Sequence, residues 1–187
     1  LLRYALKLAT GTGKTVVMAM IVTWSTLHKK KVSGSSLSTN LLVVVPNLTV
    51  RDRVSGTTER ASVGSLGFEG DGDSFWPTLS ADGRTLTFMS QATTFGGGDP
   101  AFRDVFVRDR QAGTTVLASV ASTGVPANAD SWFPAVSADG HHVAFASGAS
   151  NLVSGDTNGE QDVFVHDLRD GTTERVSLAT TGAEGNA

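Results

Sequence analysis

The residues with the clearest capacity for chemistry form one run near the start of the chain, Leu8-Ala-Thr-Gly-Thr-Gly-Lys-Thr15. In a phosphate-binding loop, glycines let backbone N–H groups approach phosphate oxygens, a lysine reaches the β- and γ-phosphates, and a threonine hydroxyl holds Mg²⁺. The spacing therefore predicts a site for ATP and Mg²⁺, with the threonine as the metal ligand. The residues of this predicted ATP site are Gly11, Thr12, Gly13, Lys14 and Thr15.

The elements that must position this loop form a predicted β-α-β unit. A short apolar strand over 4–8 precedes the loop, and an apolar helix follows it from Val16 to Leu27. The helix would place its positive N-terminal end beside the phosphates. After a polar loop, Leu41–Val45 is typical of a buried parallel strand, which Pro46 ends.

Two motifs of this unit, Ala9-Thr-Gly-Thr-Gly-Lys-Thr15 and Leu42-Val-Val-Val-Pro46, resemble motifs I and Ia of the superfamily-two helicases. Residues 1–53 as a whole are similar to the motor subunit of type III restriction enzymes. The resemblance implies binding of ATP and Mg²⁺, translocation on DNA and a cytoplasmic location.

Other parts of such a motor are missing from the sequence. No Asp-Glu pair follows a later apolar strand, and there is neither an arginine-finger motif nor a second motor lobe. A phosphate loop without the acid that positions Mg²⁺ and water hydrolyses ATP poorly. We therefore expect a vestigial ATP-binding motif and leave enzyme activity open. The alternative is a Gly-Thr-Gly turn that arose by chance.

A second segment, residues 54–187, repeats itself with a period of 57–58 residues. Asp73-Ser-Phe-Trp-Pro77 recurs as Asp130-Ser-Trp-Phe-Pro134, and Asp104-Val-Phe-Val-Arg-Asp109 recurs as Asp162-Val-Phe-Val-His-Asp167. A fixed period of this length is typical of solenoids and propellers, in which one repeat is one structural unit.

Each period contains four short strands, expected in the first copy over 76–80, 85–90, 104–109 and 114–120. Ala-Asp-Gly joins the first two strands, and its glycine takes positive φ in a tight turn. Four antiparallel strands per repeat, stacked radially, make a β-propeller blade. We expect the turn glycines of the two copies to be Gly83 and Gly140.

The repeat resembles TolB-like, WD-repeat-like propellers through Pro77-x-x-Ser-x-Asp-Gly83, Asp104-Val-Phe-Val-x-Asp109 and Gly113-Thr-Thr. The resemblance implies a non-catalytic module that binds a protein or glycan in an exported protein. A propeller needs about four to eight blades. Because this segment supplies two blades and a trailing strand over 57–63, we expect a fragment or a piece that assembles with others.

The fold class is therefore mixed: a short β-α-β phosphate-loop fragment, followed by all-β antiparallel propeller blades. Composition changes at the same place, since residues 1–53 carry a net charge of +7 and residues 54–187 carry −10. Val50-Arg-Asp-Arg53 belongs to the helicase-like part and recurs in the repeat as Val107-Arg-Asp-Arg110. We interpret the chain as a composite in which two unrelated coding sequences are joined at this tetrapeptide.

One further set of residues has the spacing of metal ligands. Asp156-Thr-Asn-Gly-Glu-Gln-Asp162 places oxygen ligands around a glycine, as at the start of a calcium loop. The candidate ligands are Asp156, Asn158 and Asp162, and the alternative is a glycine turn capped by Asp.

Composition excludes several other functions. The absence of Cys excludes disulfides, thiolate zinc sites and thiol catalysis. The longest apolar run is too short to span a membrane, so we expect no membrane partner.

Overall fold

The computed structural model describes residues 41–44, 48–52 and 56–185, and these contain strands and turns but no helix. The predicted phosphate loop and the β-α-β elements before residue 41 lie outside the described residues. The chain divides into two compact units, Leu1–Ala61 and Ser62–Ala187, and each is described by itself. A search of the described residues finds no helix long and apolar enough to cross a membrane.

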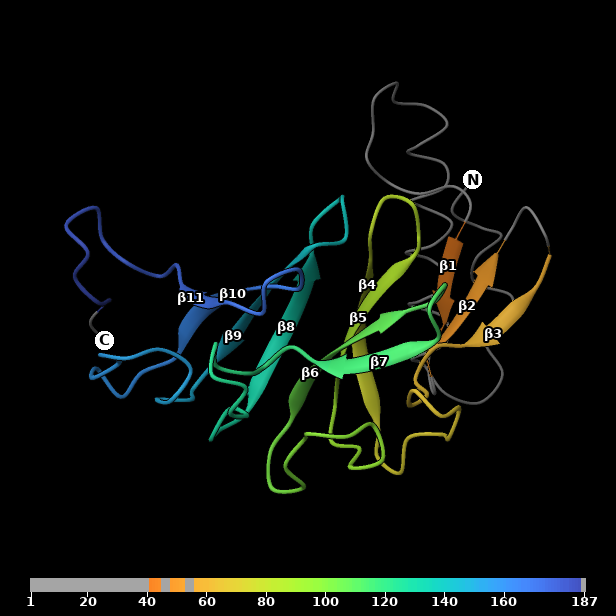
Figure 1. The fold of residues 1–187 in the computed structure, drawn as a ribbon, viewed down its shortest axis with the longest axis horizontal. Helices are drawn as coiled ribbons and strands as arrows, with labels where there is room; N and C mark the ends of the chain where they lie inside the picture. The colour runs from red at the N-terminus through yellow and green to blue at the C-terminus, as the bar shows by residue number, and fades with distance from the viewer. Residues whose placement is uncertain (1–40, 45–47, 53–55, 186–187) are drawn as a thin grey trace, which may run out of the picture. The chain divides into compact units, whose positions relative to one another are not determined.

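The described part of the first unit is a small antiparallel sheet in the order β1-β2-β3 (Figure 1). Its strands are β1 (Leu41–Val44), β2 (Thr49–Asp52) and β3 (Thr58–Arg60). The sequence predicts a parallel strand over 41–45, whereas β1 pairs with β2 in antiparallel fashion. The short connection between them allows a hairpin, because a parallel crossover needs a dozen or more residues. The predicted parallel partner over 4–8 lies outside the described residues.

The trailing strand predicted over 57–63 forms over a shorter range, as β3 (Thr58–Arg60), and it pairs with β2. This pair repeats the backbone hydrogen bonds of the blades that follow. Ala61 N donates to Leu48 O, as Ala118 N donates to Val105 O one period later. The repeat pattern is thus present on both sides of the composition boundary between residues 53 and 54.

The second unit contains two four-stranded antiparallel sheets, which we call the first and second blades. The first blade has the order β4-β5-β6-β7, and the second has the order β8-β9-β10-β11 (Figure 1). The strands are β4 (Ser74–Leu79), β5 (Thr85–Ser90), β6 (Asp104–Asp109), β7 (Thr114–Leu117), β8 (Ser131–Val136), β9 (His142–Ser147), β10 (Asp162–Asp167) and β11 (Thr173–Arg175). The predicted four antiparallel strands per repeat are therefore present, as a propeller-like blade requires.

The tight turns form as predicted. Gly83 and Gly140 have φ values of 72° and 78°, which a residue without a Cβ adopts at low cost. In each turn the glycine N–H donates to the serine carbonyl three residues earlier, at 3.0 Å. These closed turns set the antiparallel register of β4 with β5 and of β8 with β9.

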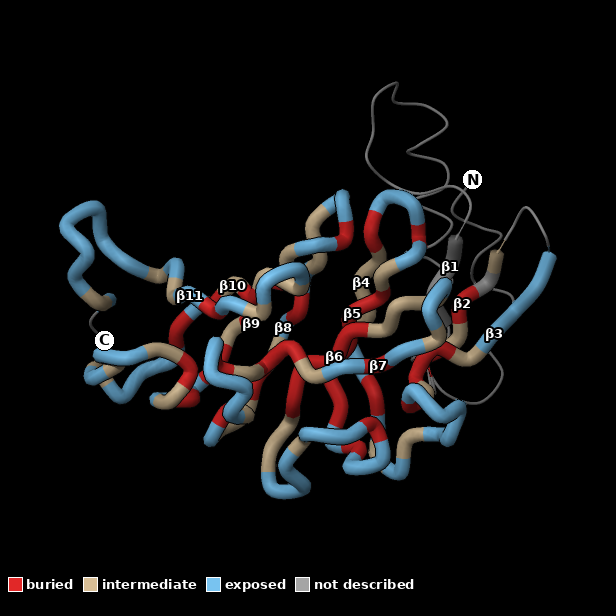
Figure 2. Tube along the Cα trace, viewed as in Figure 1, coloured by how far each residue is buried: buried red, intermediate tan, exposed pale blue. Residues whose placement is uncertain are grey.

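The core of each blade contains phenylalanines on its two middle strands. Figure 2 shows that these strands carry buried residues. Phe88 and Phe106 stack in the first blade, as Phe145 and Phe164 do in the second, both at 5.9 Å between ring centroids. Phe95 closes the first core from the long loop after β5, and Leu152 is buried at the corresponding position of the second. The long loops after β5 and β9 thus also supply core side chains.

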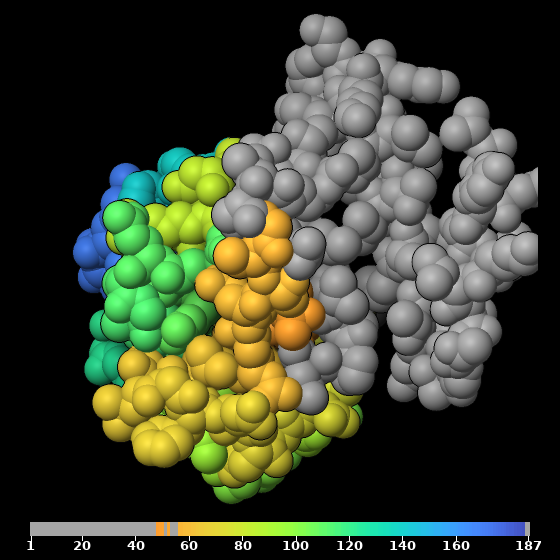
Figure 3. Space-filling view, turned by 90° about the vertical axis from the view of Figure 1, so that its right-hand side faces the viewer, coloured from red at the N-terminus to blue at the C-terminus, as the bar shows by residue number. Residues whose placement is uncertain are grey.

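Backbone and side-chain hydrogen bonds join the two blades. Ala81 N donates to Ala138 O at 2.9 Å, and Val136 N donates to Thr78 Oγ1 at 3.1 Å. The linker that enters the first blade, yellow in Figure 3, is tied to the outer strand β7, because Thr115 donates its hydroxyl to Val63 O. Each blade is therefore fixed along its inner and outer strands.

Candidate functional site

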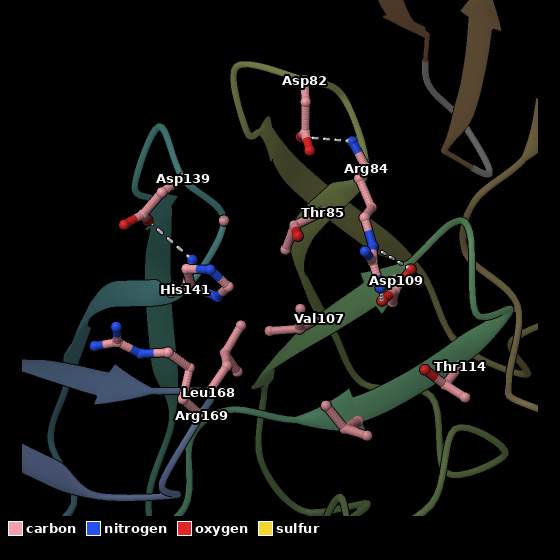
Figure 4. Close-up of a pocket in the computed structure, with 12 residues that line it drawn as sticks. Asp82, Arg84, Thr85, Val107, Asp109, Thr114, Asp139, His141, Leu168 and Arg169 are labelled. Carbon is pink, nitrogen blue, oxygen red and sulfur yellow. Dashed lines mark hydrogen bonds and ion pairs between the residues drawn. The ribbon is translucent and has the colours of Figure 1, made fainter.

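A pocket of about 460 Å³ lies between the two blades, at the end where their tight turns meet (Figure 4). Both blades contribute to it through the turns between their first and second strands and between their third and fourth strands. The pocket is lined by Asp82, Arg84, Thr85, Val107, Asp109, Thr114, Val116, Asp139, Gly140, His141, Leu168 and Arg169.

Two aspartates at corresponding positions of the blades, Asp82 and Asp139, stand on the tight turns. Oδ1 of each accepts a hydrogen bond from the serine hydroxyl two residues earlier and from the backbone N–H two residues later. The serine hydroxyl bond is the main cause that lowers the pKa of each carboxyl. Both side chains are therefore anionic at neutral pH.

The first blade neutralises another pocket aspartate with an arginine. Arg84 holds Asp109 through three hydrogen bonds, from Nε at 3.1 Å to each oxygen and from Nη2 at 2.7 Å to Oδ2. This fork geometry lowers the pKa of Asp109 to about 2.

The second blade neutralises the corresponding aspartate, Asp167, with different residues. Nη2 of Arg169 lies 2.6 Å from Asp167 Oδ2, and His142 Nε2 lies 3.3 Å from the same oxygen. Hydrogen bonds from Arg169 hold the pKa of Asp167 well below its usual range. Both arginines at the pocket are thus paired with an acid of their own blade.

Three aliphatic side chains line the pocket beneath these charges. Val107 is buried, Leu168 is partly buried, and Val116 is exposed. In Figure 4, Val107 and Leu168 lie at the centre of the view, while the Arg169 guanidinium points away from Val107. The pocket therefore combines an apolar floor with a charged rim.

The structure brings the predicted calcium ligands together, but around an arginine. Arg175 Nη1 lies 3.3 Å from Asp156 Oδ1 and 3.2 Å from Asp162 Oδ2, while Nη2 lies 2.6 Å from Glu184 Oε1. Asn158 Nδ2 donates to Asp162 Oδ2 at 3.2 Å. The guanidinium thus lies where a cation would balance these carboxylates.

Charged side chains in this cluster are largely removed from solvent. The side chains of Asp156 and Arg175 are only 2% and 8% exposed, and burial raises the pKa of Asp156. Asp156 Oδ2 and Arg175 Nε are buried and have no hydrogen-bond partner. Within the part of the chain that the structure describes, no group of three or more His, Asp or Glu side chains is arranged to hold a metal ion.

An aromatic pair on the inner strands also distinguishes the blades from ordinary sheets. Trp76 and Phe133 stack at 4.5 Å between ring centroids, and they are 47% and 61% exposed. Both have positive φ, 48° and 52°, although each precedes a proline. Positive φ is rare for bulky residues, and a residue before proline normally lies in the β region. Corresponding irregularities of strand register occur at both sites.

Sequence reasoning found the turns that carry Asp82 and Asp139 but did not identify the pocket. Its lining residues are far apart in the chain, and only the packing of the blades brings Arg84 near Leu168. The available signal was the repeated Asp-Gly turn, because it places an acid at one end of every blade. The predicted phosphate-loop residues, Gly11 to Thr15, lie outside the described residues.

Comparison with protein families supports the resemblance of the first segment. Residues 2–93 match the family model described as "Type III restriction enzyme, res subunit", slightly under half of the chain. The match extends past the predicted boundary at residue 53 into the first blade. No curated protein matches the sequence.

Solved structures show similarity to the second segment. TolB from Acinetobacter baumannii matches with a TM-score of 0.44 and 17% identity over 78% of this chain and 31% of that one. A putative TolB from Agrobacterium tumefaciens matches with a TM-score of 0.44 and 19% identity over 72% and 43%. The tricorn protease matches with a TM-score of 0.48 and 18% identity over 80% and 14%. The chain spans less than half of each of these proteins. Both resemblances predicted from the sequence are thus confirmed as resemblances.

Proposed function

We propose that residues 54–187 act as a non-catalytic binding module of the β-propeller type, with a protein or glycan as the partner. The observation that carries this proposal is the pocket between the blades. Its volume lies within the range of ligand sites, about 300–1,000 Å³, and its rim carries fixed charged groups. The turns that form it are closed by hydrogen bonds and joined to each other, so the site is built before a ligand arrives.

An NMR screen of the ¹⁵N-labelled full chain tests this function. The probes are neutral oligosaccharides, a basic peptide and an acidic peptide, each added separately. We expect at least one probe to shift the amide signals of Thr85, Thr114 and Gly140, which line the pocket. Signals at the opposite end of the blades, such as Gly96 and Gly155, serve as the internal control. If no probe moves the pocket signals, the binding function is wrong.

We propose as a second function that Gly11, Thr12, Gly13, Lys14 and Thr15 bind ATP, with Mg²⁺ on Thr15. The match of residues 2–93 to a restriction-motor family supports this proposal. In this composite chain the site would be vestigial for hydrolysis, and DNA would be a partner only if the motor function persists. A fluorescent ATP analogue should bind the parent chain with micromolar affinity and the Lys14→Ala variant far more weakly. Equal binding by both chains would contradict this proposal.

We keep calcium binding at Asp156, Asn158 and Asp162 as a separate proposal. The convergence of these side chains supports it, although Ca²⁺ would have to compete with the Arg175 guanidinium. Thermal unfolding with and without Ca²⁺ tests the site. We expect Ca²⁺ to raise the melting temperature of the parent chain and not that of Asp156→Ala. A parent chain that melts identically with and without Ca²⁺ would exclude the site.

A further inference from the structure

We propose that the pocket between the blades binds the side chain of a lysine or arginine from an extended segment of a partner protein. This inference rests on the proposed binding function and specifies the chemistry of the ligand. Its basis is the distribution of charge and apolar surface within one cavity.

The unbalanced charge of the pocket is negative. Arg84 is held by Asp109, and Arg169 is held by Asp167. Among the described residues, no arginine forms a direct ion pair with Asp82 or Asp139, although Arg84 attracts Asp82 and Arg169 attracts Asp139 from a greater distance. Across the described residues, Oδ2 of each of these two aspartates has no hydrogen-bond partner, because only Oδ1 is engaged. Two ionised carboxylates therefore retain acceptor capacity at the rim.

One further titratable side chain, that of His141, also lines the pocket. His141 lies beside Asp139, to which its backbone N–H donates at 3.1 Å, and its imidazole is exposed. The wider field has the same sign as the two carboxylates, since residues 54–187 carry a net charge of −10. A cationic ligand is thus attracted both over distance and at the rim.

The apolar floor selects among cationic ligands. Val107, Val116 and Leu168 offer aliphatic surface below the carboxylates. A basic side chain has a matching construction, because its methylene stem packs on apolar surface while its charged head stays at a polar rim. A simple metal ion would gain nothing from this floor. Charge-assisted hydrogen bonds to Asp82 and Asp139 would then fix the ammonium or guanidinium.

The position of the two aspartates indicates how a partner would approach. They occupy the same place in adjacent repeats, on turns joined by the Ala81–Ala138 hydrogen bond. Both side chains are exposed and lie on the tight turns, away from Val107 and Leu168 in the view of Figure 4. An extended segment can cross this end of the blades and insert one side chain, whereas a folded domain would first meet the turns.

The test uses the full chain and a capped peptide in which lysine alternates with glycine. Binding is followed by NMR titration at pH 7.5. A second peptide replaces lysine with norleucine, which keeps the alkyl stem and removes the charge. We expect the lysine peptide to shift the pocket amides and the norleucine peptide to bind at least about tenfold more weakly.

Variants locate the interaction. Asp82→Asn with Asp139→Asn should weaken binding of the lysine peptide at least about tenfold. The matched control, Asp73→Asn with Glu160→Gln, removes the same charge from exposed acids outside the pocket lining and should leave affinity nearly unchanged. Equal losses in the two double variants would show general charge attraction and overturn the proposal. So would binding of the norleucine peptide as tight as that of the lysine peptide.

The outcomes also separate this inference from the proposed function. If a neutral oligosaccharide or the acidic peptide shifts the pocket amides while the lysine peptide does not, the binding function stands and the basic side chain is wrong. If no probe shifts them, both proposals are wrong. Unchanged spectra of the free variants away from the substituted turns would show that the blades remain folded.

Discussion

The first and second blades have the same strand order and nearly the same turns, yet they place different side chains at corresponding positions. Leu117 at the end of β7 corresponds to Arg175 at the end of β11. Arg84 after the first tight turn corresponds to His141 after the second, and Gln111 corresponds to Arg169. The shared features are those that make the backbone, and the differences concern charge.

The comparison shows that the same blade backbone can stabilise an aspartate at a given position through different partners. Asp104 and Asp162 begin the third strands, and each accepts a hydrogen bond from a serine of its own blade, Ser119 or Ser177. The second oxygen of Asp104 accepts a backbone N–H, whereas that of Asp162 contacts Arg175. The second blade therefore relies on an ion cluster where the first relies on a neutral donor and a leucine.

The largest effect is expected when Arg175 is replaced by leucine, the residue at the corresponding position of the first blade. Arg175→Leu leaves Asp156, Asp162 and Glu184 without their common cation. We expect a loss of about 3 kcal/mol in the free energy of unfolding at pH 7, at the lower end for a buried ion pair because Glu184 is partly exposed. Urea denaturation measures the loss.

The pH dependence of this variant identifies the cause. Carboxyls that are buried without a cation have a raised pKa in the folded state, so the folded chain binds protons more readily than the unfolded one. Stability of the variant should then be greatest at low pH and fall as pH rises above about 4. Arg175→Lys is the control that keeps the charge, and it should lose less at pH 7. A loss as large at pH 4 as at pH 7 would point to packing instead.

Gly140 sharpens the comparison at the contact between the blades. An added Cβ would lie 2.6 Å from Thr85 Oγ1, and the residue has φ +78°. Gly171 has φ +73° and nothing within 4 Å of that position. We expect Gly140→Ala to cost about 2–3 kcal/mol and Gly171→Ala about 1–2 kcal/mol, because only the first adds a steric conflict to the backbone strain. Chemical denaturation of both variants measures the difference.

A second substitution checks that the extra cost comes from this contact. Thr85→Ala removes the side chain that the new Cβ would meet, so Gly140→Ala should cost less in that background. Equal costs with and without Thr85→Ala would mean that the blades separate enough to admit the methyl group.

The strands at the centre of each blade could be predicted from the sequence because local patterns determine them. The predicted strands 85–90 and 104–109 coincide with β5 and β6, and Val105, Phe106 and Val107 are buried as expected of a strand covered on both faces. The predicted strand over 76–80 begins two residues too late. Ser74 is a buried polar residue, and its hydroxyl donates to Ser90 on the paired strand. A hydropathy pattern cannot show that pairing.

Features that depend on tertiary packing could not be predicted. Phe95 and Leu152 lie in loops without periodicity, so nothing local marks them as core residues. The calcium hypothesis grouped Asp156 with Asp162 by spacing but missed Arg175, which comes from another strand. For the same reason the pocket was missed, since its carboxylates and its apolar floor come from separate turns and strands.

A third prediction compares glycine and alanine substitutions at Phe133, which has positive φ, and at its neighbour Trp132. At the φ of 52° found at Phe133, alanine would be strained by its Cβ, whereas glycine adopts this conformation readily. We therefore expect Phe133→Gly to be about 1 kcal/mol more stable than Phe133→Ala. At the neighbouring Trp132, which lies outside the positive-φ set, the order should be reversed, because glycine weakens a strand. Urea denaturation of the four variants decides. If the alanine variant is more stable than the glycine variant at both positions, Phe133 does not have this backbone conformation.

The smallest expected effects concern the partly buried acids Asp109 and Asp167, which form ion pairs with different residues in the two blades. Arg84→Ala should raise the pKa of Asp109 from about 2 toward its ordinary value of about 3.9, because the largest cause of the shift is lost. Arg169→Ala should raise the pKa of Asp167 less far, since His142 lies 3.3 Å from the same carboxyl and is a further cause that lowers this pKa. Titration of the carboxyl ¹³C signals measures both values.

The sign of the stability change follows from the direction of these shifts. A carboxyl with a lowered pKa contributes stability above its unfolded value near 4, and this contribution disappears as pH falls toward the folded value near 2. Arg84→Ala should therefore flatten the acid limb of the stability profile: stability at pH 7 falls, and stability near pH 2 changes little. The loss at pH 7 should be small, because solvent and salt screen the pair. Each variant should leave the acid of the other blade unchanged. A change in the pKa of Asp167 in the Arg84→Ala variant would instead mean that the charges of the two blades are coupled across the pocket. The two blades could then not be treated as independent of each other.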